Sequence, residues 1–377
     1  MKINQPRRPI AVIGAGIAGL SAARTLQELG VPHVLLERFD RAGGRLNSRY
    51  GEGWVADHGA PYIRTSDQLI TTMIRDLGLE RERVSIQGGV HRLHANGTIT
   101  VPPNAGIDLS RVCPAEGFAD FTWKLAETVN TQYNKPVGAI RWDNNNKVFW
   151  WDREGQVFWF EDEEKEPLRD PVTRQVLVAS GVILATTATA AARIADRSPS
   201  LVNLRETLHG VQYSSTFAAM FKVPRLNTPW FALQGDRDAR FSWIGIEDKK
   251  SPNRIEPQFS LVVAHAEPLW SSRLITMDKH AALAEVYMAL RNIVEVLPEA
   301  PISQTYKRWN VSRVATPPLG TPTPAAATPG HAPFALAGDY VYGSRAEDAA
   351  QAGRDAALAL VAQLPARRNV LGLELAK

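Results

Sequence analysis

The chain has 377 residues, long enough for two domains, and its 44% hydrophobic and 22% charged residues are typical of a globular protein. With 43 Lys and Arg against 39 Asp and Glu, the net charge is only +4. No basic stripe with interleaved aromatic residues is present, so nucleic acid is not an expected partner. The single cysteine, Cys113, and the lack of an apolar run of about 18 residues predict a reducing, cytoplasmic location and no membrane span.

The N-terminal segments have the pattern of a βαβ unit. Residues 9–16 (PIAVIGAG) predict a buried strand, 17–30 (IAGLSAARTLQELG) a helix, and 33–37 (HVLLE) a second buried strand. This order within about 30 residues indicates a parallel sheet. Residues 65–78 (TSDQLITTMIRDLG) predict another helix, with a cap at position 66 or 67.

The middle of the chain predicts antiparallel strands between helices. A hairpin is expected around the Asn96-Gly97 turn, and a helix over 118–130. Apolar and polar residues alternate between turn-forming clusters over 137–164, which indicates an antiparallel meander. The run SGVILATTATAAARI (180–194) then returns to a buried strand and a helix.

Residues from about 204 to 313 are expected to form a second insertion between elements of the parallel sheet. This insertion is predicted to contain strands at 216–223 and 259–266 and a helix over 277–297. A proline-rich connector over 317–333 then precedes a strand and a long C-terminal helix.

The pattern as a whole predicts an α/β fold: a Rossmann-like dinucleotide-binding domain interrupted by an α+β, mixed-sheet substrate domain. We assign residues 1–79, 132–203 and 318–377 to the dinucleotide-binding domain. The substrate domain is expected to comprise residues 80–131 and 204–317.

A glycine-rich turn joins the first predicted strand to the first helix. Gly14 permits the tight turn, Gly16 lets a pyrophosphate approach the backbone, and Gly19 lets helix and strand pack closely. The helix N-terminus directs free N–H groups and a positive dipole toward the phosphates. Glu37, 23 residues after Gly14, is expected to bind the adenosine ribose and to disfavour a 2′-phosphate.

The residues after Glu37 exceed what an NAD site requires. The pattern E-R-x-x-R-x-G-G-R (37–45) resembles the flavoprotein amine oxidase superfamily, in which this segment closes over FAD. Residues 57–63 (DHGAPYI), 182–194 and 336–357 resemble three further family segments, although Thr187 stands where the family has proline. The resemblance implies noncovalent FAD, because no cysteine is present in the C-terminal region.

The resemblance also implies roles for individual residues. Arg45 would approach the pyrophosphate or the flavin ring, and Asp339 would bind a ribityl hydroxyl. The final helix, with a capping box expected at Ser344 and Glu347, would direct its N-terminus at the flavin. The complete set of cofactor-binding candidates is Gly14, Ala15, Gly16, Ile17, Gly19, Glu37, Arg38, Gly43, Gly44, Arg45, Gly59, Ala60, Pro61, Val137, Ala185, Gly338, Asp339, Arg345, Ala346 and Glu347.

Within the superfamily, the chain is most similar to renalase and its bacterial relatives, chiefly through YKRWNVSRVATP (306–317). The candidate catalytic residues are Trp309, Tyr340 and Lys307; no metal site is expected.

The resemblance implies hydride transfer from a C–H bond next to nitrogen to flavin N5, followed by reoxidation by O2 to H2O2. The substrate would be a reduced nicotinamide isomer or an amine, and the protein a monomer or weak dimer. The alternatives are an amine or amino-acid oxidase, a desaturase of the same superfamily, and a flavin- or NAD-binding module without turnover.

Overall fold

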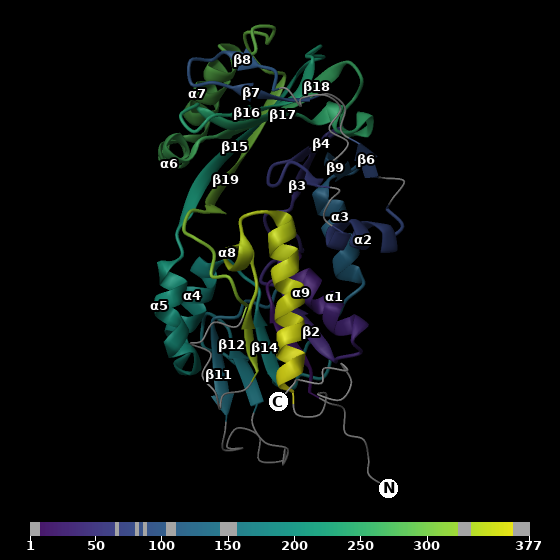
Figure 1. Ribbon diagram of the computed structural model, residues 1–377, viewed down its shortest axis with the longest axis vertical. Coiled ribbons are helices and arrows are strands. Elements are labelled where there is room, and N and C mark those ends of the chain that lie inside the picture. Colours follow the sequence, from purple (N-terminus) through teal and green to yellow (C-terminus); the bar gives the residue numbers. More distant parts are fainter. Residues whose placement is uncertain are drawn as a thin grey trace. The chain divides into compact units, whose positions relative to one another are not determined.

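The computed structural model in Figure 1 describes residues 8–64, 68–79, 83–85, 89–102, 111–143, 157–322 and 333–364. The expected cap at position 66 or 67 and most of the proline-rich connector lie outside these residues. Two compact units are present: unit 1 comprises residues 1–44, 123–212 and 314–377, and unit 2 comprises residues 45–122 and 213–313. No helix among the described residues is long and apolar enough to cross a membrane.

A five-stranded parallel sheet forms the centre of unit 1. Its strands, in spatial order, are β10 (Thr131–Gln132), β2 (His33–Leu36), β1 (Ile10–Ile13), β14 (Gly181–Leu184) and β20 (Phe334–Leu336). The three central strands are apolar and almost completely buried, as expected for a parallel sheet. The predicted βαβ unit and the predicted return of the chain at 180–184 are confirmed.

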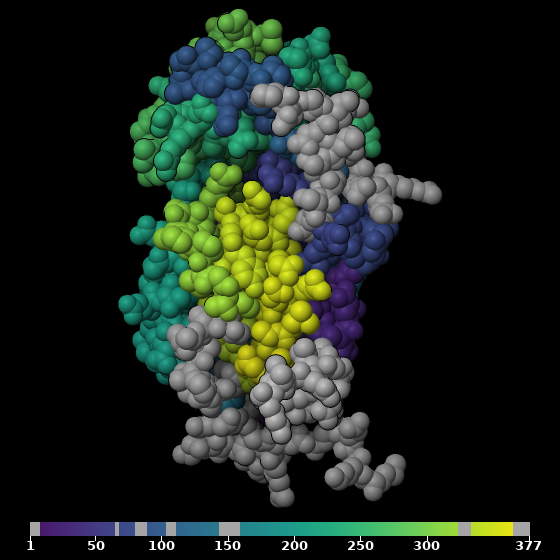
Figure 2. All heavy atoms as spheres, viewed as in Figure 1, coloured from purple at the N-terminus to yellow at the C-terminus, as the bar shows by residue number. Residues whose placement is uncertain are grey.

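Two helices of unit 1 pack closely against each other. These are α1 (Ile17–Glu28) and α9 (Ala346–Gln363), and Figure 1 shows them side by side. A Cβ atom on Gly353 would lie 2.0 Å from the carbonyl oxygen of Ala18, so only glycine permits this approach. The opposite side of α9 lies on the surface that Figure 2 shows in yellow.

The remaining described elements of unit 1 include antiparallel strands at both ends of the meander predicted over 137–164, and they confirm the helix predicted after it. Residues 144–156 of that meander lie outside the described residues. Strand β11 pairs antiparallel with β12, and β12 with β13. The elements are β11 (Ala139–Asp143), β12 (Val157–Glu161), β13 (Val178–Ala179), α4 (Ala188–Arg197), η1 (Pro199–Leu204) and α5 (Arg205–Gly210).

Unit 2 contains a seven-stranded mixed sheet. The strands in spatial order are β19 (Ser303–Val314), β15 (Tyr213–Pro224), β18 (Phe259–Ala266), β17 (Phe241–Ile246), β16 (Trp230–Gly235), β7 (Gly89–Leu93) and β8 (Ile99–Thr100). Strands β7 and β8 form the hairpin predicted at Asn96-Gly97. Strand β7 pairs parallel with β16. The pairing is antiparallel between β15 and β18, between β18 and β17, and between β17 and β16.

The two faces of this sheet pack against different elements. Alternate residues such as Phe221 and Val262 join a core with α6 (Pro268–Thr276) and α7 (Lys279–Arg291). Residues between them, such as Met220 and Val263, pack on the other face in a smaller core with Ala56. The other described elements of unit 2 are β3 (Ser48–Gly51), β4 (Trp54–Asp57), β5 (Ile63–Arg64), α2 (Gln68–Asp76), β6 (Arg83–Ser85), β9 (Arg111–Pro114), η2 (Glu247–Lys249) and η3 (Pro252–Arg254).

The units divide the chain at different positions from those expected. Residues 45–79 group with unit 2, because β4 packs against β18, η2 and η3. Residues 123–131 group with unit 1, and helix α3 (Phe118–Glu127) crosses the boundary. The assignment of FAD and substrate to separate parts of the chain remains a prediction.

The C-terminal elements also differ in detail from the expectation. The last strand ends at Leu336, and Asp339–Tyr342 form a short helix, α8, because Gly338 adopts φ +146° and turns the chain. Helix α9 begins one residue later than expected, with Arg345 as its N-cap. The Asp348 carboxylate, not that of Glu347, accepts the backbone N–H of Arg345 at 3.2 Å.

Candidate functional site

In unit 1, four predicted cofactor-binding positions follow the carboxyl ends of parallel strands. Gly14 follows β1, Glu37 follows β2, Ala185 follows β14, and Asp339 comes shortly after β20. The carboxyl ends of parallel strands lie at one edge of a sheet, so the fold brings these loops to the same edge. The strands that follow β1 in the chain lie on both sides of it, β2 on one side and β14 on the other. Open α/β sheets bind their ligands at the edge next to such a reversal of strand order.

The geometry of the glycine-rich turn matches the three roles that the spacing predicts. Gly14 has φ +102°, and a Cβ atom there would lie 2.8 Å from the carbonyl oxygen of Ala185. A Cβ on Gly19 would lie only 1.8 Å from the oxygen of Gly14, so this glycine allows α1 to pack on the turn. A Cβ on Gly16 would meet no atom within 4 Å, so this side of the turn is open.

The predicted Gly-Gly pair lies directly against this turn. The N–H of Gly43 donates to the carbonyl oxygen of Ala15 at 2.9 Å, and Gly43 forms a bridge with Gly16. Gly44 adopts φ +58°, and a Cβ there would lie 3.4 Å from the Cα of Gly16. The two glycine-containing segments thus form a backbone surface with few side chains, which a phosphate group could approach closely.

The Glu37 carboxylate is buried beside the glycine-rich turn and oriented by backbone groups. Its two oxygens accept the N–H groups of Ala15 at 2.7 Å and Phe39 at 3.0 Å. Burial raises the pKa of Glu37, although these backbone hydrogen bonds and the charge of Arg38 oppose the shift. Each oxygen retains a lone pair for a ribose hydroxyl, so the residue fits its predicted role.

The C-terminal segment supplies a second part of the same edge. Asp339 is 4% exposed and begins α8, and Tyr340 is fully buried. Arg345 is exposed at the N-terminus of α9, and Ala346 and Glu347 are half-buried in its first turn. The helix therefore begins a few residues after β20, as predicted, and its N-terminal dipole is available to a negative group.

The remaining candidates in unit 1 are less closely grouped. Ala15 and Ile17 are buried in the glycine-rich turn and at the start of α1. Arg38 is exposed, with its guanidinium 3.7 Å from the carboxylate of Glu163. Val137 is half-buried in the loop before β11.

In unit 2, Arg45 lies beside the segment at 57–63. The Arg45 Nη1 donates to the carbonyl oxygen of Ser312 at 2.8 Å, and its guanidinium lies over the ring of Tyr213. A Cβ on Gly59 would lie 1.9 Å from the Arg45 oxygen, and the N–H of Ala60 donates to this oxygen at 3.2 Å. Pro61 is half-buried in the same segment. A role of these residues in FAD binding remains a prediction.

Two of the three candidate catalytic residues lie together on β19. The Nζ of Lys307 lies 4.9 Å from the ring centre of Trp309, and Trp309 Nε1 donates to the carbonyl oxygen of His58 at 2.9 Å. Tyr340 belongs to unit 1. The catalytic role of all three remains a prediction.

Sequence reasoning missed two histidines, of which His58 lies next to Trp309. The ring of His58 lies 5.4 Å from that of Trp309, and His265 on β18 interacts with the backbone of His58. Within the described part of the chain, the buried atoms Nδ1 of His58 and Nε2 of His265 have no hydrogen-bond partner. The only signal in the sequence was the position of His58 within the DHGAPYI segment.

These two histidines predict a loss of stability on mild acidification. Burial, followed by nearby positive charge, lowers the pKa of His58 to about 4 and that of His265 to about 3. Below about pH 6.5 the unfolded chain binds protons that the folded protein does not, at a cost of up to about 1.4 kcal/mol per pH unit for each histidine. We expect urea midpoints to fall from pH 6.5 to pH 4, and less steeply in a His58→Gln/His265→Gln variant. Parallel slopes would contradict this origin.

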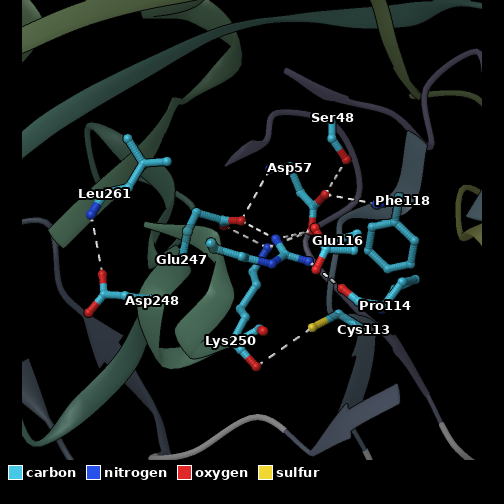
Figure 3. Close-up of polar contacts among 12 residues, drawn as sticks. Ser48, Asp57, Cys113, Pro114, Glu116, Phe118, Glu247, Asp248, Lys250 and Leu261 are labelled. Atoms are coloured by element: carbon cyan, nitrogen blue, oxygen red, sulfur yellow. Dashed lines mark hydrogen bonds and ion pairs between the residues drawn. The ribbon is translucent and has the colours of Figure 1, made fainter. Parts of the chain in front are cut away.

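A second group that the sequence did not reveal is a cluster of four buried charges in unit 2: Asp57, Glu247, Lys250 and Arg254. Figure 3 labels Asp57, Glu247 and Lys250. Arg254 Nη1 donates to both carboxylates, at 2.6 Å to Asp57 Oδ2. Lys250 Nζ lies 3.2 Å from Asp57 Oδ2 and 2.7 Å from Glu247 Oε1. The two positive and two negative side chains therefore compensate one another.

Further hydrogen bonds connect this cluster to the backbone of unit 2. Arg254 donates to the carbonyl oxygens of Pro114 and Ala115, at 2.7 and 3.2 Å. The other oxygen of Asp57 accepts from Ser48 Oγ at 2.6 Å and from the N–H of Phe118 at 3.0 Å. Since Asp57 directly precedes His58, the cluster fixes the start of the segment that carries His58, Gly59 and Ala60.

The charges of the cluster determine the ionisation of Asp57. Burial alone would raise the pKa of this carboxyl group, but the charges of Arg254 and Lys250 outweigh burial and hold the pKa well below its usual range. Asp57 therefore stays negatively charged in the folded protein at all ordinary pH values, and its two cations stay paired.

A parallel sheet with a glycine-rich turn, an adjacent Gly-Gly segment and a buried Glu37 defines unit 1 as a dinucleotide-binding fold. The open side at Gly16 and the orientation of the Glu37 carboxylate both fit the pyrophosphate and ribose of FAD. Residues 17–105 and 104–361 match the family model for flavin containing amine oxidoreductase. The chain belongs to this family, whose cofactor is FAD, and the predicted fold class and cofactor are thereby confirmed.

Curated relatives match the chain over a limited region. Mitochondrial protoporphyrinogen oxidase of Nicotiana tabacum is 36% identical over 101 residues, or 26% of this chain and 20% of the relative. Probable polyamine oxidase 4 of Arabidopsis thaliana is 38% identical over 86 residues, or 22% of this chain and 17% of the relative. The matched regions thus span about a fifth of these relatives' length.

Solved structures match nearly the whole fold. A putative protoporphyrinogen oxidase from Exiguobacterium has a TM-score of 0.71 at 13% identity, covering 94% of this chain and 99% of the other. Cyclohexylamine oxidase from Brevibacterium oxydans has a TM-score of 0.69 at 13% identity, with the same coverage. At this identity, the similarity establishes the fold alone.

Proposed function

We propose that the protein is an FAD-dependent oxidase that removes a hydride from a C–H bond next to a nitrogen atom. The observation that carries this proposal is the glycine-rich turn with the buried Glu37 carboxylate, in a chain of the flavin containing amine oxidoreductase family. When bound, FAD accepts the hydride and returns the electrons to O2, which gives H2O2.

The chain's own residues would bind and orient the cofactor. The backbone at Gly16 and Gly44, with the N-terminus of α1, would hold the pyrophosphate, and Glu37 would accept the ribose hydroxyls. Asp339 and the N-terminus of α9 follow β20 at the same edge and would hold the ribityl chain and a negative charge on the ring. Binding would be noncovalent, since the chain's one cysteine, Cys113, is buried in unit 2.

Two substrate classes follow from the similarities. The resemblance to renalase supports a reduced nicotinamide isomer, and the names of the relatives, which include polyamine and L-amino-acid oxidases, support an amine or amino acid. A desaturase reaction is the alternative within the superfamily, and a flavin- or NAD-binding module without turnover the alternative of another class. We also propose a cytoplasmic monomer or weak dimer.

Absorption spectroscopy followed by anaerobic substrate addition tests this function. We expect flavin bands near about 370 and 450 nm, release of the flavin on denaturation, and bleaching of the bands by at least one amine, amino acid or reduced nicotinamide isomer. Admission of O2 should restore the bands and produce H2O2. If no bands appear after incubation with FAD, the cofactor assignment is wrong; if bands appear but no compound bleaches them, the module without turnover is favoured.

A further inference from the structure

His58, which is buried, and His265, which is half-buried, belong to a group of aromatic side chains on one face of the unit 2 sheet. His265 lies between Ala264 and Ala266, which face α6 and α7, so its side chain points to the opposite face. Trp243 is paired with His265 across the strands and shares that face, and its ring lies 5.7 Å from that of Tyr62. We call His58, Tyr62, Trp243, His265 and Trp309 the aromatic–histidine cluster.

The cluster contains polar atoms that the described part of the protein leaves without partners. His58 is 7% exposed, yet its Nδ1 accepts or donates no hydrogen bond there, and the same holds for Nε2 of His265. Burial of such groups is unfavourable unless a water or a ligand binds them. A neutral imidazole offers an N–H donor on one nitrogen and a lone pair on the other, so the two rings together offer both kinds of group.

The charges around the cluster are predominantly positive. Lys307 and Arg49 act on His58, and Arg313 acts on His265. These three repel a proton on the imidazoles and disfavour a bound cation for the same reason. Lys250 also acts on His265, but Asp57 and Glu247 compensate its charge.

The carboxylate of Asp57, which directly precedes His58 and acts on it, is already fully bound. Its Oδ2 contacts Arg254 and Lys250, and its Oδ1 accepts from Ser48 and Phe118. The Asp57 carboxylate is therefore not available to pair with an ammonium group.

We propose that His58 and His265 bind the uncharged polar group of the substrate and select a neutral carboxamide-bearing ring over an alkylammonium ion. A carboxamide has both a donor and an acceptor, which complements two neutral imidazoles. The rings of Trp243, Tyr62 and Trp309 provide flat apolar surfaces beside them for an aromatic ring of the ligand. This inference rests on the proposed oxidase function and decides between its two substrate classes.

Two small probes that differ mainly in charge test the preference. Benzamide carries a neutral carboxamide on an aromatic ring, whereas benzylamine carries an ammonium group at pH 7.5. In anaerobic titrations of the FAD-loaded protein, followed by calorimetry and by the flavin spectrum, we expect benzamide to bind at least about tenfold more tightly. Equal or tighter binding of benzylamine, or bleaching of the flavin by it, would overturn the proposal.

Variants of His265 link the preference to the cluster. His265→Leu should weaken benzamide binding about tenfold, and His265→Gln, which keeps a donor and an acceptor, should remain within about threefold of the original protein. His91→Leu is the matched control, because His91 is a buried histidine on β7 of the same sheet. Unchanged benzamide affinity in His265→Leu would refute the role of this residue.

The outcomes separate this inference from the oxidase function. If amines bleach the flavin and benzylamine binds well, the oxidase proposal stands and the inference fails. If the protein binds no FAD, the oxidase proposal fails, and benzamide binding to the protein alone still reports on the histidines. If His265→Leu does not fold, the affinities of the original protein and of His265→Gln for benzamide and benzylamine decide whether the proposed preference for the neutral probe exists.

Discussion

Replacement of Arg254 by Met is expected to lower the free energy of unfolding by about 3–5 kcal/mol, a large fraction of the about 5–15 kcal/mol that stabilises an ordinary protein. Arg254 has no exposed surface, and its guanidinium donates to Asp57, Glu247 and two backbone carbonyls. The substitution leaves Lys250 alone against two buried carboxylates, and one of these negative charges is then uncompensated. Urea denaturation followed by tryptophan fluorescence measures the loss.

Two further variants distinguish loss of buried charge from loss of any arginine. Arg92→Met removes a partly exposed arginine, 3.3 Å from Asp236 in unit 2, and should cost less than about 1 kcal/mol. The double variant Arg254→Met/Glu247→Gln removes one charge of each sign and should recover part of the loss. Similar losses for Arg254→Met and Arg92→Met, or no recovery in the double variant, would show that charge compensation is not the cause.

Replacement of Gly16 by Ala is expected to weaken FAD binding on the order of a hundredfold, or about 2.7 kcal/mol, with little change in the stability of the protein without cofactor. A Cβ on Gly16 meets no protein atom within 4 Å, so the new methyl group is accommodated by the fold. The same methyl group occupies the side on which the pyrophosphate would approach the backbone.

Gly19→Ala provides the contrasting variant. A Cβ on Gly19 would lie 1.8 Å from the carbonyl oxygen of Gly14, so this substitution should destabilise the protein itself. Thermal unfolding with and without FAD separates the two effects, since at a fixed FAD concentration a more tightly bound cofactor raises the melting temperature more. If Gly16→Ala retains the full stabilisation by FAD, the pyrophosphate does not bind at this turn.

Features that depend on local sequence could be predicted well. The glycine spacing, the apolar strands and the position of Glu37 are set within about 30 residues, and the structure has each of them where the sequence placed it. The family segment around Gly43 and Gly44 also lies against the turn, as the predicted cofactor site requires.

Features that depend on distant contacts could not be predicted. The stretch EDKKSPNR (247–254) has the composition of a solvent-exposed loop, yet Glu247, Lys250 and Arg254 are buried. Their burial is possible only because Asp57, almost 200 residues earlier, compensates the net positive charge of these three side chains. A pattern read within one segment contains no information about a partner so far away.

The exact start of the last helix could not be predicted, because neighbouring residues compete for the capping position. Both Glu347 and Asp348 are placed to cap the last helix, and a shift of one residue decides between them.

The guanidinium of Arg45 contacts the oxygen of Ser312, 267 residues later, so the position of this family residue also depends on a distant contact. Its predicted role at FAD is not tested by that contact.

The parallel sheet of unit 1 has a consequence for how the chain folds during synthesis. Strand β1 pairs with β14, β14 pairs with β20, and α1 (Ile17–Glu28) packs against α9 (Ala346–Gln363), more than 300 residues later. Neither unit is continuous in sequence, and α9 leaves the ribosome more than 300 residues after α1. One face of α1 therefore stays uncovered until α9 has been made, which favours slow folding and dependence on chaperones.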